Sequence, residues 1–182
     1  MKINNRGISL IVIFVLQTHY GFTQGIKKYK IEALGASGIT IGNNQLFVVQ
    51  ERNPKIISLN VKGEILADSI KIPLYRKGKD NEGISFFNNS LWTVLEDSGK
   101  IMNFSLKGDD IKSWIPSKIV PYNGGYGYES IAIDSTNKKL YIGHERIKKE
   151  NKYISTIHTF TIDSTYSLVE DSVNYKIELN DG

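Results

Sequence analysis

The chain contains an internal repeat of about 45 residues, and this repeat constrains the fold more than any other feature. The segment from Ser37 to Leu66 (SGITIGNNQLFVVQERNPKIISLNVKGEIL) aligns without a gap with the segment from Glu82 to Ile111 (EGISFFNNSLWTVLEDSGKIMNFSLKGDDI). A third copy begins at Glu129 (ESIAIDSTNKKLYIGHER) and has two extra residues in its first turn. The starts of the three copies are 45 and then 47 positions apart. A period of this length indicates similar units that stack against one another.

Each repeat predicts four short strands, because β-branched and aromatic residues alternate with turns that contain Asn, Pro or Gly. In the first unit the predicted strands are Gly38–Ile41, Gln45–Gln50, Lys55–Asn60 and Glu64–Lys71. Four antiparallel strands make one blade of a β-propeller, and a blade buries both of its faces only between other blades. We therefore predict an all-β protein, a β-propeller with four-stranded antiparallel blades, of which about three are present.

The repeat also predicts the domain organisation. Residues 25–182 form a partial propeller, with repeat units near 37–72, 82–120 and 129–177. Propellers close with about four to eight blades, and the sequence ends at YKIELNDG without a strand that would pair with the first blade. We expect a truncated chain that lacks later blades; a small complete sandwich of the same strands is the alternative.

Residues 1–24 are predicted to be a signal peptide. Lys2 and Arg6 precede an apolar run from Gly7 to Leu16, and the polar stretch QTHYGFTQ follows. This run is shorter than the roughly 20 residues that a membrane-spanning helix needs. We therefore expect export to the periplasm, the outer envelope or the medium, with no stable transmembrane span. An uncleaved N-terminal membrane anchor is the alternative.

The composition excludes several classes of function. The chain has no Cys, which rules out disulfides and thiol chemistry. Without Lys2 and Arg6 the net charge falls to +2, and the remaining basic residues are scattered, so no nucleic-acid partner is expected. The sequence contains no Walker loop, no H-E-x-x-H and no G-x-S-x-G motif.

Acidic residues recur at both ends of the first hairpin in the second and third units and at one end in the first unit, at equal sequence distances from a turn Asn. The pairs are Ser37 with Glu51 around Asn44, Glu82 with Glu96 around Asn89, and Glu129 with Glu145 around Asn137. If each hairpin is symmetric about that Asn, the paired side chains face each other with Cβ atoms about 5 Å apart. All of them would lie at one end of the blades, on one face near the central channel.

Two facing carboxylates destabilise a sheet unless something compensates their charge. A hard cation such as Ca²⁺ is one solution, since it prefers carboxylate and carbonyl oxygens. An ion pair is a second, because Arg52 and Arg146 directly follow Glu51 and Glu145. A retained proton on one acid is a third, and it would suit general acid catalysis. A purely architectural role, in which the Glu side chains cap backbone N–H groups, also remains open.

Other residues carry weaker signals. His144 adjoins Glu145 and is either a ligand or base or a packing residue, whereas His158 sits in an alternating strand and is expected to be structural. Trp92 and Trp114 are predicted to lie in the blade core. The Gly- and Tyr-rich loop from Tyr122 to Glu129 either stacks on a sugar or aromatic ligand or simply connects two blades.

At NEGISFFNNSLWTVLEDSGKIMNFSL and YGYESIAIDSTNKKLYIGHER the sequence resembles a group of exported bacterial β-propellers. These are the esterase-like phytases and the related SdiA-regulated (YjiK-like) proteins, in which an E-G-[IL]-A opening, a short turn and an aromatic-rich strand precede an acidic residue. The matching residues are Glu82, Gly83, Ile84 and Glu96 in the second unit, and Glu129, Ile131 and Glu145 in the third. Ser130 replaces the usual Gly, which leaves the site of the third unit less certain.

The resemblance implies an exported propeller with an acid-lined funnel that binds Ca²⁺. Our hypothesis is a binding protein for a small-molecule or envelope ligand. Its predicted metal ligands are Glu82, Glu96, Glu129 and Glu145, and its predicted ligand-binding residues are His144, Arg146 and Arg52. The alternative is a metal-dependent hydrolase of phosphoesters or related esters, in which metal-bound water attacks the substrate. The chain shows no nucleophile or base of its own, so we name no catalytic residue and prefer the binding protein.

Overall fold

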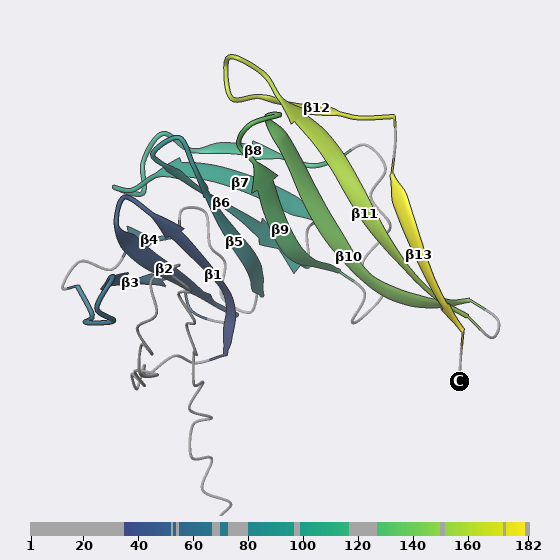
Figure 1. Cartoon of the computed structure of the whole chain (residues 1–182), viewed down its shortest axis with the longest axis horizontal. Helices are drawn as coiled ribbons and strands as arrows, with labels where there is room; N and C mark the ends of the chain where they lie inside the picture. Colours follow the sequence, from purple (N-terminus) through teal and green to yellow (C-terminus); the bar gives the residue numbers. More distant parts are fainter. Residues whose placement is uncertain are drawn as a thin grey trace, which may run out of the picture.

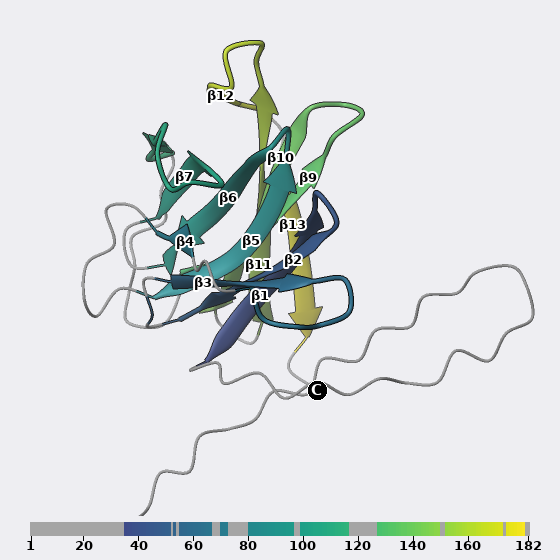
Figure 2. The same cartoon turned by 90° about the vertical axis from the view of Figure 1, so that its left-hand side faces the viewer.

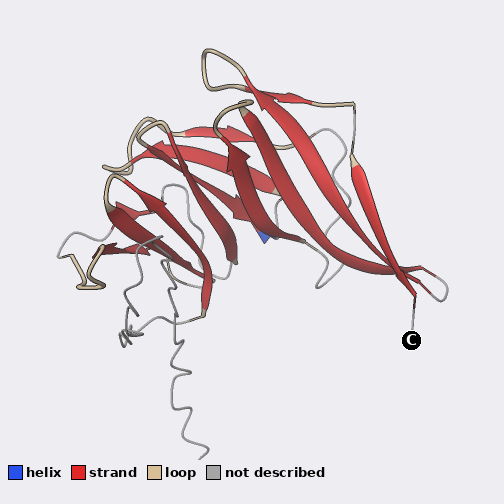
Figure 3. Ribbon diagram, viewed as in Figure 1, coloured by secondary structure: helices blue, strands red, loops and turns tan. Residues whose placement is uncertain are grey.

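The computed structural model of the chain describes residues 35–51, 53, 55–66, 70–72, 80–96, 99–116, 127–149, 152–172 and 174–180. Apart from a short helical turn at Glu96, the elements of these residues are strands, and they form three antiparallel sheets that follow one another in chain order (Figure 1; Figure 3). Each sheet contains one copy of the repeat. The all-β prediction, with three sheets of propeller-blade type, is confirmed.

The strands have the following bounds. The first sheet contains β1 (Ala36–Gly42), β2 (Gln45–Gln50), β3 (Lys55–Asn60) and β4 (Ile70–Lys71). The second contains β5 (Asn81–Phe87), β6 (Ser90–Leu95), β7 (Lys100–Ser105) and β8 (Lys112–Trp114). The third contains β9 (Tyr128–Asp134), β10 (Lys139–Lys149), β11 (Lys152–Ile162), β12 (Leu168–Glu170) and β13 (Tyr175–Asn180). Neighbouring strands pair in sequence order, and β13 adds to β11 alongside β12.

The fourth predicted strand of the first unit is the one that the structure changes most. We predicted a strand from Glu64 to Lys71, whereas β4 contains only Ile70 and Lys71. Ile65 forms an isolated bridge with Leu59, and residues 67–69 lie outside the described part of the chain. The outermost strand of a blade has one neighbour instead of two, so it gains less from pairing than the inner strands do.

The tight turns form where the paired asparagines predict them. Asn43 and Asn44 have φ angles of 48° and 56°, and Asn88 and Asn89 have φ angles of 48° and 58°. Two successive residues with positive φ define the hairpin turn that best fits the twist of the flanking strands, and Asn tolerates this conformation. These turns fix the register of the two hairpins, in which Gly42 pairs with Gln45 and Phe87 pairs with Ser90.

The two larger hydrophobic clusters of the described residues lie between successive sheets, and a smaller one, formed by Leu46, Val48 and Leu59, lies on the first sheet alone. Because side chains alternate across a strand, the second sheet contributes residues to both of its neighbours. Leu91, Met102 and Phe104 pack with Phe47 of the first sheet. On the other face, Trp92 is fully buried against the third sheet and stacks on Trp114 at a ring distance of 5.5 Å. The predicted core position is confirmed for Trp92, whereas Trp114 is only partly buried and packs against the edge of this cluster.

The first strand of each sheet lies beside the first strand of the next, so that β5 lies between β1 and β9 (Figure 1; Figure 2). The backbones come very close at two glycines. A Cβ atom on Gly38 would lie 2.9 Å from the backbone nitrogen of Ile84, and one on Gly83 would lie 2.7 Å from that of Ile131. The Gly in the repeated strand opening therefore allows one blade to pack against the next.

The predicted signal peptide, residues 1–24, lies outside the described residues, and so do the first five residues of the Gly- and Tyr-rich loop. The described part of the chain contains no helix that is both long enough and apolar enough to cross a membrane.

Candidate functional site

Each of the three repeated hairpins carries the same irregularity. In the second sheet Ile84 pairs with Thr93 and Asn81 with Leu95, so the first strand has one more residue than the second over this stretch. The pairing of β9 with β10 and of β1 with β2 shifts in the same way. Such a β-bulge bends the strand and redirects a side chain. The residues at the bulge are Ser37, Glu82 and Glu129.

The bulge changes which residues lie opposite the second acid of each hairpin. The backbone N–H of Glu51 donates to the carbonyl of Gly35, that of Glu96 to Asp80 and that of Glu145 to Gly127, at 2.8, 3.1 and 2.9 Å. Our prediction that Ser37 faces Glu51, Glu82 faces Glu96 and Glu129 faces Glu145 across the strand pair is therefore wrong. The symmetry centre of the two Asn-Asn hairpins lies between two turn residues instead of on one Asn, and the bulge then adds one further residue.

The acids nevertheless meet, because adjacent blades bring them together. One carboxylate oxygen from each of Glu96, Glu129 and Glu145 lies within 4.8 Å of the other two. Glu96 follows β6 of the second sheet, whereas Glu129 and Glu145 belong to β9 and β10 of the third. We call these three residues the acidic triad. It spans the boundary between two blades, and its spacing suits a cation that is coordinated by oxygen.

Glycine makes room for the triad. A Cβ atom on Gly127 would lie 2.0 Å from Cγ of Glu96, so any larger residue at this position would displace that side chain. Gly35 has the equivalent position beside Glu51, where a Cβ atom would lie 2.9 Å from a carboxylate oxygen. The Gly-rich approach to Glu129 in the sequence is thus partly explained by a side chain from the preceding blade.

Glu82 is the fourth predicted metal ligand, and it lies in a different environment from the triad. Its side chain is only 9 % exposed, and it has neither a hydrogen bond nor an ion pair among the described residues. Burial, together with the negative charges of Glu129, Glu51, Glu96 and Asp80, raises the pKa of Glu82 to about 8, and burial is the largest cause. A buried carboxyl group without a partner favours its neutral form until a positive charge arrives.

Glu129 shows the same effect more weakly. Partial burial raises the pKa of its carboxyl group, and the nearby charges of Glu145, Glu51 and Asp80 act in the same direction. Asp80 is a member of this acidic group that the sequence analysis missed. The corresponding positions in the other two hairpins are Gly35 and Gly127, so the repeat itself gave no signal there.

Arg52 and Arg146 are the two arginines that were proposed to form ion pairs with the acids. Arg52 lies outside the described residues, and Arg146 lies in β10 with its side chain outside them. Among the described side chains, no Lys or Arg forms an ion pair with Glu82, Glu129 or Glu145.

A buried aromatic cluster lies behind the triad. Tyr128, His144 and His158 are each at most 4 % exposed, and their rings make edge-to-face contacts with centroids 5.6 to 6.1 Å apart. Nδ1 of His144 is 2.9 Å from the carbonyl oxygen of Glu145. Burial raises the pKa of Tyr128 to about 12, aided by the charge of Glu170. His144 thus supports the backbone of Glu145 from inside, and the structural role predicted for His158 is confirmed.

The first and second blades are joined at the corresponding place by Asn81. Its backbone N–H donates to the carbonyl of Glu51 at 2.9 Å, and its side-chain amide donates to the same oxygen at 3.3 Å. In return the hydroxyl of Ser37 donates to the carbonyl of Asn81 at 2.5 Å. Ser37 replaces the bulge acid of the other two units, and here it serves as a link between blades.

Comparison with solved structures identifies the architecture. The chain is similar to a putative 6-phosphogluconolactonase from Bacteroides uniformis, with 15 % identity and a TM-score of 0.54 over 79 % of this chain and 45 % of that one. It is similar to a streptogramin B lyase, with 16 % identity and a TM-score of 0.50 over 82 % and 59 %. A nidogen–laminin complex gives 14 % identity and a TM-score of 0.54 over 84 % and 57 %.

These likenesses establish a β-propeller fold. The chain spans about half the length of the solved structures that it matches. A search of curated proteins finds no significant match. The sequence profile of the family described as SdiA-regulated matches residues 17–177, which is most of the chain and includes all three blades. The protein therefore belongs to the SdiA-regulated family, one of the two related groups that its repeated strand openings resemble.

Proposed function

We propose that this SdiA-regulated β-propeller is an exported binding protein in which the acidic triad holds a divalent cation, with Ca²⁺ as the expected ion. The observation that carries the proposal is the approach of Glu96, Glu129 and Glu145 to within 4.8 Å. Glu82 is buried and has no partner among the described residues, and the nearby charges of Glu96 and Glu129 help to raise its pKa. The predicted signal peptide supports export.

Ca²⁺ fits this site better than smaller or softer ions. It takes about six to eight oxygen ligands in flexible geometry, whereas Mg²⁺ demands a near-ideal octahedron and Zn²⁺ prefers His or Cys. Three carboxylates supply only part of such a shell. The open positions would accept oxygen atoms from a small-molecule or envelope ligand, so that the cation becomes the point at which the ligand is recognised.

Calorimetric titration of the chelator-treated protein with CaCl₂ tests the proposal. We expect Ca²⁺ to bind and to raise the melting temperature, and Mg²⁺ to bind more weakly. Glu129→Gln removes one charge from the triad with little change of shape and should weaken Ca²⁺ binding by about tenfold or more.

Glu178→Gln is the matched control for that variant. Glu178 is half-exposed and pairs with Lys152 at 3.2 Å, so its replacement removes one negative charge outside the triad. It should leave Ca²⁺ affinity unchanged. Equal weakening by both variants, or no heat of binding in the unmodified protein, would show that the triad is not a Ca²⁺ site.

A metal-dependent hydrolase is the second candidate, and the position of Glu82 favours it. Beside a cation that holds both water and substrate, a buried carboxylate could accept a proton from that water. We expect a phosphoester or carboxyl-ester panel to reveal turnover that depends on Ca²⁺ and is lost in Glu82→Gln. Turnover that survives both chelator and this variant would exclude the mechanism, while the Ca²⁺ titration would still decide whether the triad binds metal.

A further inference from the structure

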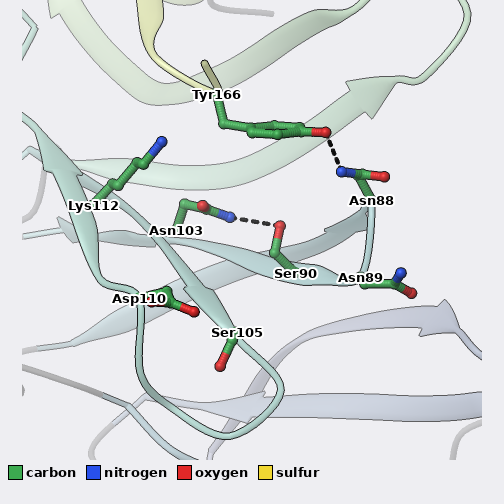
Figure 4. A pocket seen from close by; sticks show the side chains of 8 residues that line it. All are labelled: Asn88, Asn89, Ser90, Asn103, Ser105, Asp110, Lys112 and Tyr166. Atoms are coloured by element: carbon green, nitrogen blue, oxygen red, sulfur yellow. Dashed lines mark hydrogen bonds between the residues drawn. The ribbon is translucent and has the colours of Figure 1, made fainter. Parts of the chain in front are cut away.

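A pocket opens at the opposite end of the blades from the acidic triad. It has a volume of about 270 Å³. Its lining residues are Asn88, Asn89, Ser90, Asn103, Ser105, Asp110, Lys112 and Tyr166 (Figure 4). Glu82 and Asn88 lie at opposite ends of β5, so about 20 Å of strand separates the pocket from the acidic end. The pocket is therefore a distinct feature and not an extension of the candidate cation site.

Two blades build the pocket. The second sheet provides the turn Asn88–Asn89 and the inner strands that follow it, whereas Tyr166 comes from the turn between β11 and β12 of the third sheet. Figure 4 shows the ring of Tyr166 lying across the pocket above Asn103 and Ser90. An aromatic ring on one side thus faces amide and hydroxyl groups on the other.

Tyr166 is held in place at a conformational cost. Its φ angle is 59°, a region that bulky residues rarely adopt and that tends to persist at ligand-binding positions. The side-chain amide of Asn88 donates a hydrogen bond to its hydroxyl group. The Lys112 ammonium lies 5.7 Å from the ring centroid, and Phe87 makes an edge contact at 6.4 Å. The ring is therefore oriented before any ligand binds.

The floor of the pocket contains the side-chain amide of Asn103. This residue is only 6 % exposed, and its side-chain nitrogen donates to the hydroxyl of Ser90 at 2.7 Å and to the carbonyl of Leu91 at 3.3 Å. These bonds hold the amide in one orientation. Its carbonyl oxygen makes no hydrogen bond with the described residues, so it can accept one from a ligand.

The charges around the pocket balance. Asp110 and Lys112 are the two ionisable residues of opposite sign in its lining, and the Lys112 ammonium already donates to the carbonyl of Thr165. The remaining polar groups are side-chain amides and hydroxyls, which can both donate and accept hydrogen bonds. This set does not suit an ion; it suits a ligand that carries many hydroxyl groups.

We propose that this pocket binds a neutral saccharide, one ring at a time. The hydroxyl groups of the sugar would exchange hydrogen bonds with Asn89, Asn103 and Ser105, while its C–H face lies on the ring of Tyr166, whose π face is electron-rich. The volume of about 270 Å³ lies just below the range for drug-sized sites, about 300 to 1,000 Å³, which limits the ligand to about one sugar residue.

Saturation-transfer NMR on the full chain tests this proposal with glucose, galactose and N-acetylglucosamine as probes. We expect at least one of them to receive magnetisation through its C–H protons. Tyr166→Gly removes the ring while easing the backbone, because Gly adopts positive φ without cost. It should weaken binding of that sugar by about tenfold and leave Ca²⁺ affinity unchanged.

Two controls make the result decisive. Tyr175→Ala removes an exposed tyrosine of β13 that does not line the pocket, and it should leave sugar binding unchanged. Glucuronate and inorganic phosphate serve as charged probes. The proposal is overturned if none of the three neutral sugars binds, if Tyr166→Gly and Tyr175→Ala weaken binding equally, or if the charged probes compete for the pocket more strongly than the sugars do.

Discussion

Without divalent cations, the protein should lose stability through Glu82 as the pH rises from about 5 to about 8. The pKa of this carboxyl group is raised from 4.5 to about 8 in the folded chain, mainly by burial. Below pH 4.5 both states hold the proton, and Glu82 has no effect on unfolding. Above that pH the unfolded chain releases the proton first, so Glu82 lowers the free energy of unfolding by up to about 1.4 kcal/mol per pH unit.

Glu82→Gln isolates this contribution, because the other titrating groups are the same in both proteins. In chelator, urea denaturation should show equal stability of the two proteins near pH 4, and at pH 8 the variant should be more stable by on the order of 4 kcal/mol. Added Ca²⁺ should reduce the difference at pH 8, since a nearby cation favours the ionised carboxylate. A difference in stability that does not change with pH would show that the pKa of Glu82 is not raised in the folded protein.

Gly83→Ala should be the most damaging single methyl group that can be added to the interface between the second and third blades. The new Cβ would lie 2.7 Å from the backbone nitrogen of Ile131 and 3.0 Å from Cα of Ser130. Backbone atoms cannot rotate away as side chains do, so the blades must separate. Overpacking of this kind costs about 1–3 kcal/mol, and the same separation would pull Glu96 away from Glu129 and weaken the Ca²⁺ site.

Gly143→Ala is the matched control, because it adds the same methyl group in the neighbouring strand β10. Its Cβ would lie 2.3 Å from the hydroxyl oxygen of Ser130, which can turn to another rotamer. In chemical denaturation, the free energy of unfolding of Gly83→Ala should therefore be well below that of Gly143→Ala and that of the unmodified protein. If the two alanine variants are equally stable, the close approach of β5 and β9 does not limit this interface.

Much of the architecture could be predicted because residues within each repeat determine where its turns and strands form. The Asn-Asn pairs demand positive φ angles and so locate two hairpins, and the nearly continuous apolar run of Leu91–Leu95 indicates a strand buried on both faces. The short strand β4 was the exception. The Lys-Gly turn before it forms, but the bridge between Leu59 and Ile65 is isolated and β4 contains only Ile70 and Lys71, so periodicity could not predict where this edge strand begins.

The arrangement of the acids was harder to predict, because it depends on two features that a sequence does not display. One extra residue at the bulge changes every partner beyond it, and no residue type signals that shift. The approach of Glu96 to Glu129 crosses from one blade to the next, so counting along a single hairpin could not find it. The pocket beneath Tyr166 was missed for the same reason, since its ring comes from the neighbouring blade.

The sharing of sites between consecutive blades has an evolutionary consequence. Neither the acidic triad nor the pocket under Tyr166 belongs to one copy of the repeat, because each takes residues from two. Tandem duplication of a single repeat would therefore create a new junction between blades together with the new blade. Both sides of that junction would already carry the residues that form such a site. Divergence could then act on each junction separately, as the exchange of Glu for Ser at position 37 illustrates, without disturbing the cores on which the blades depend.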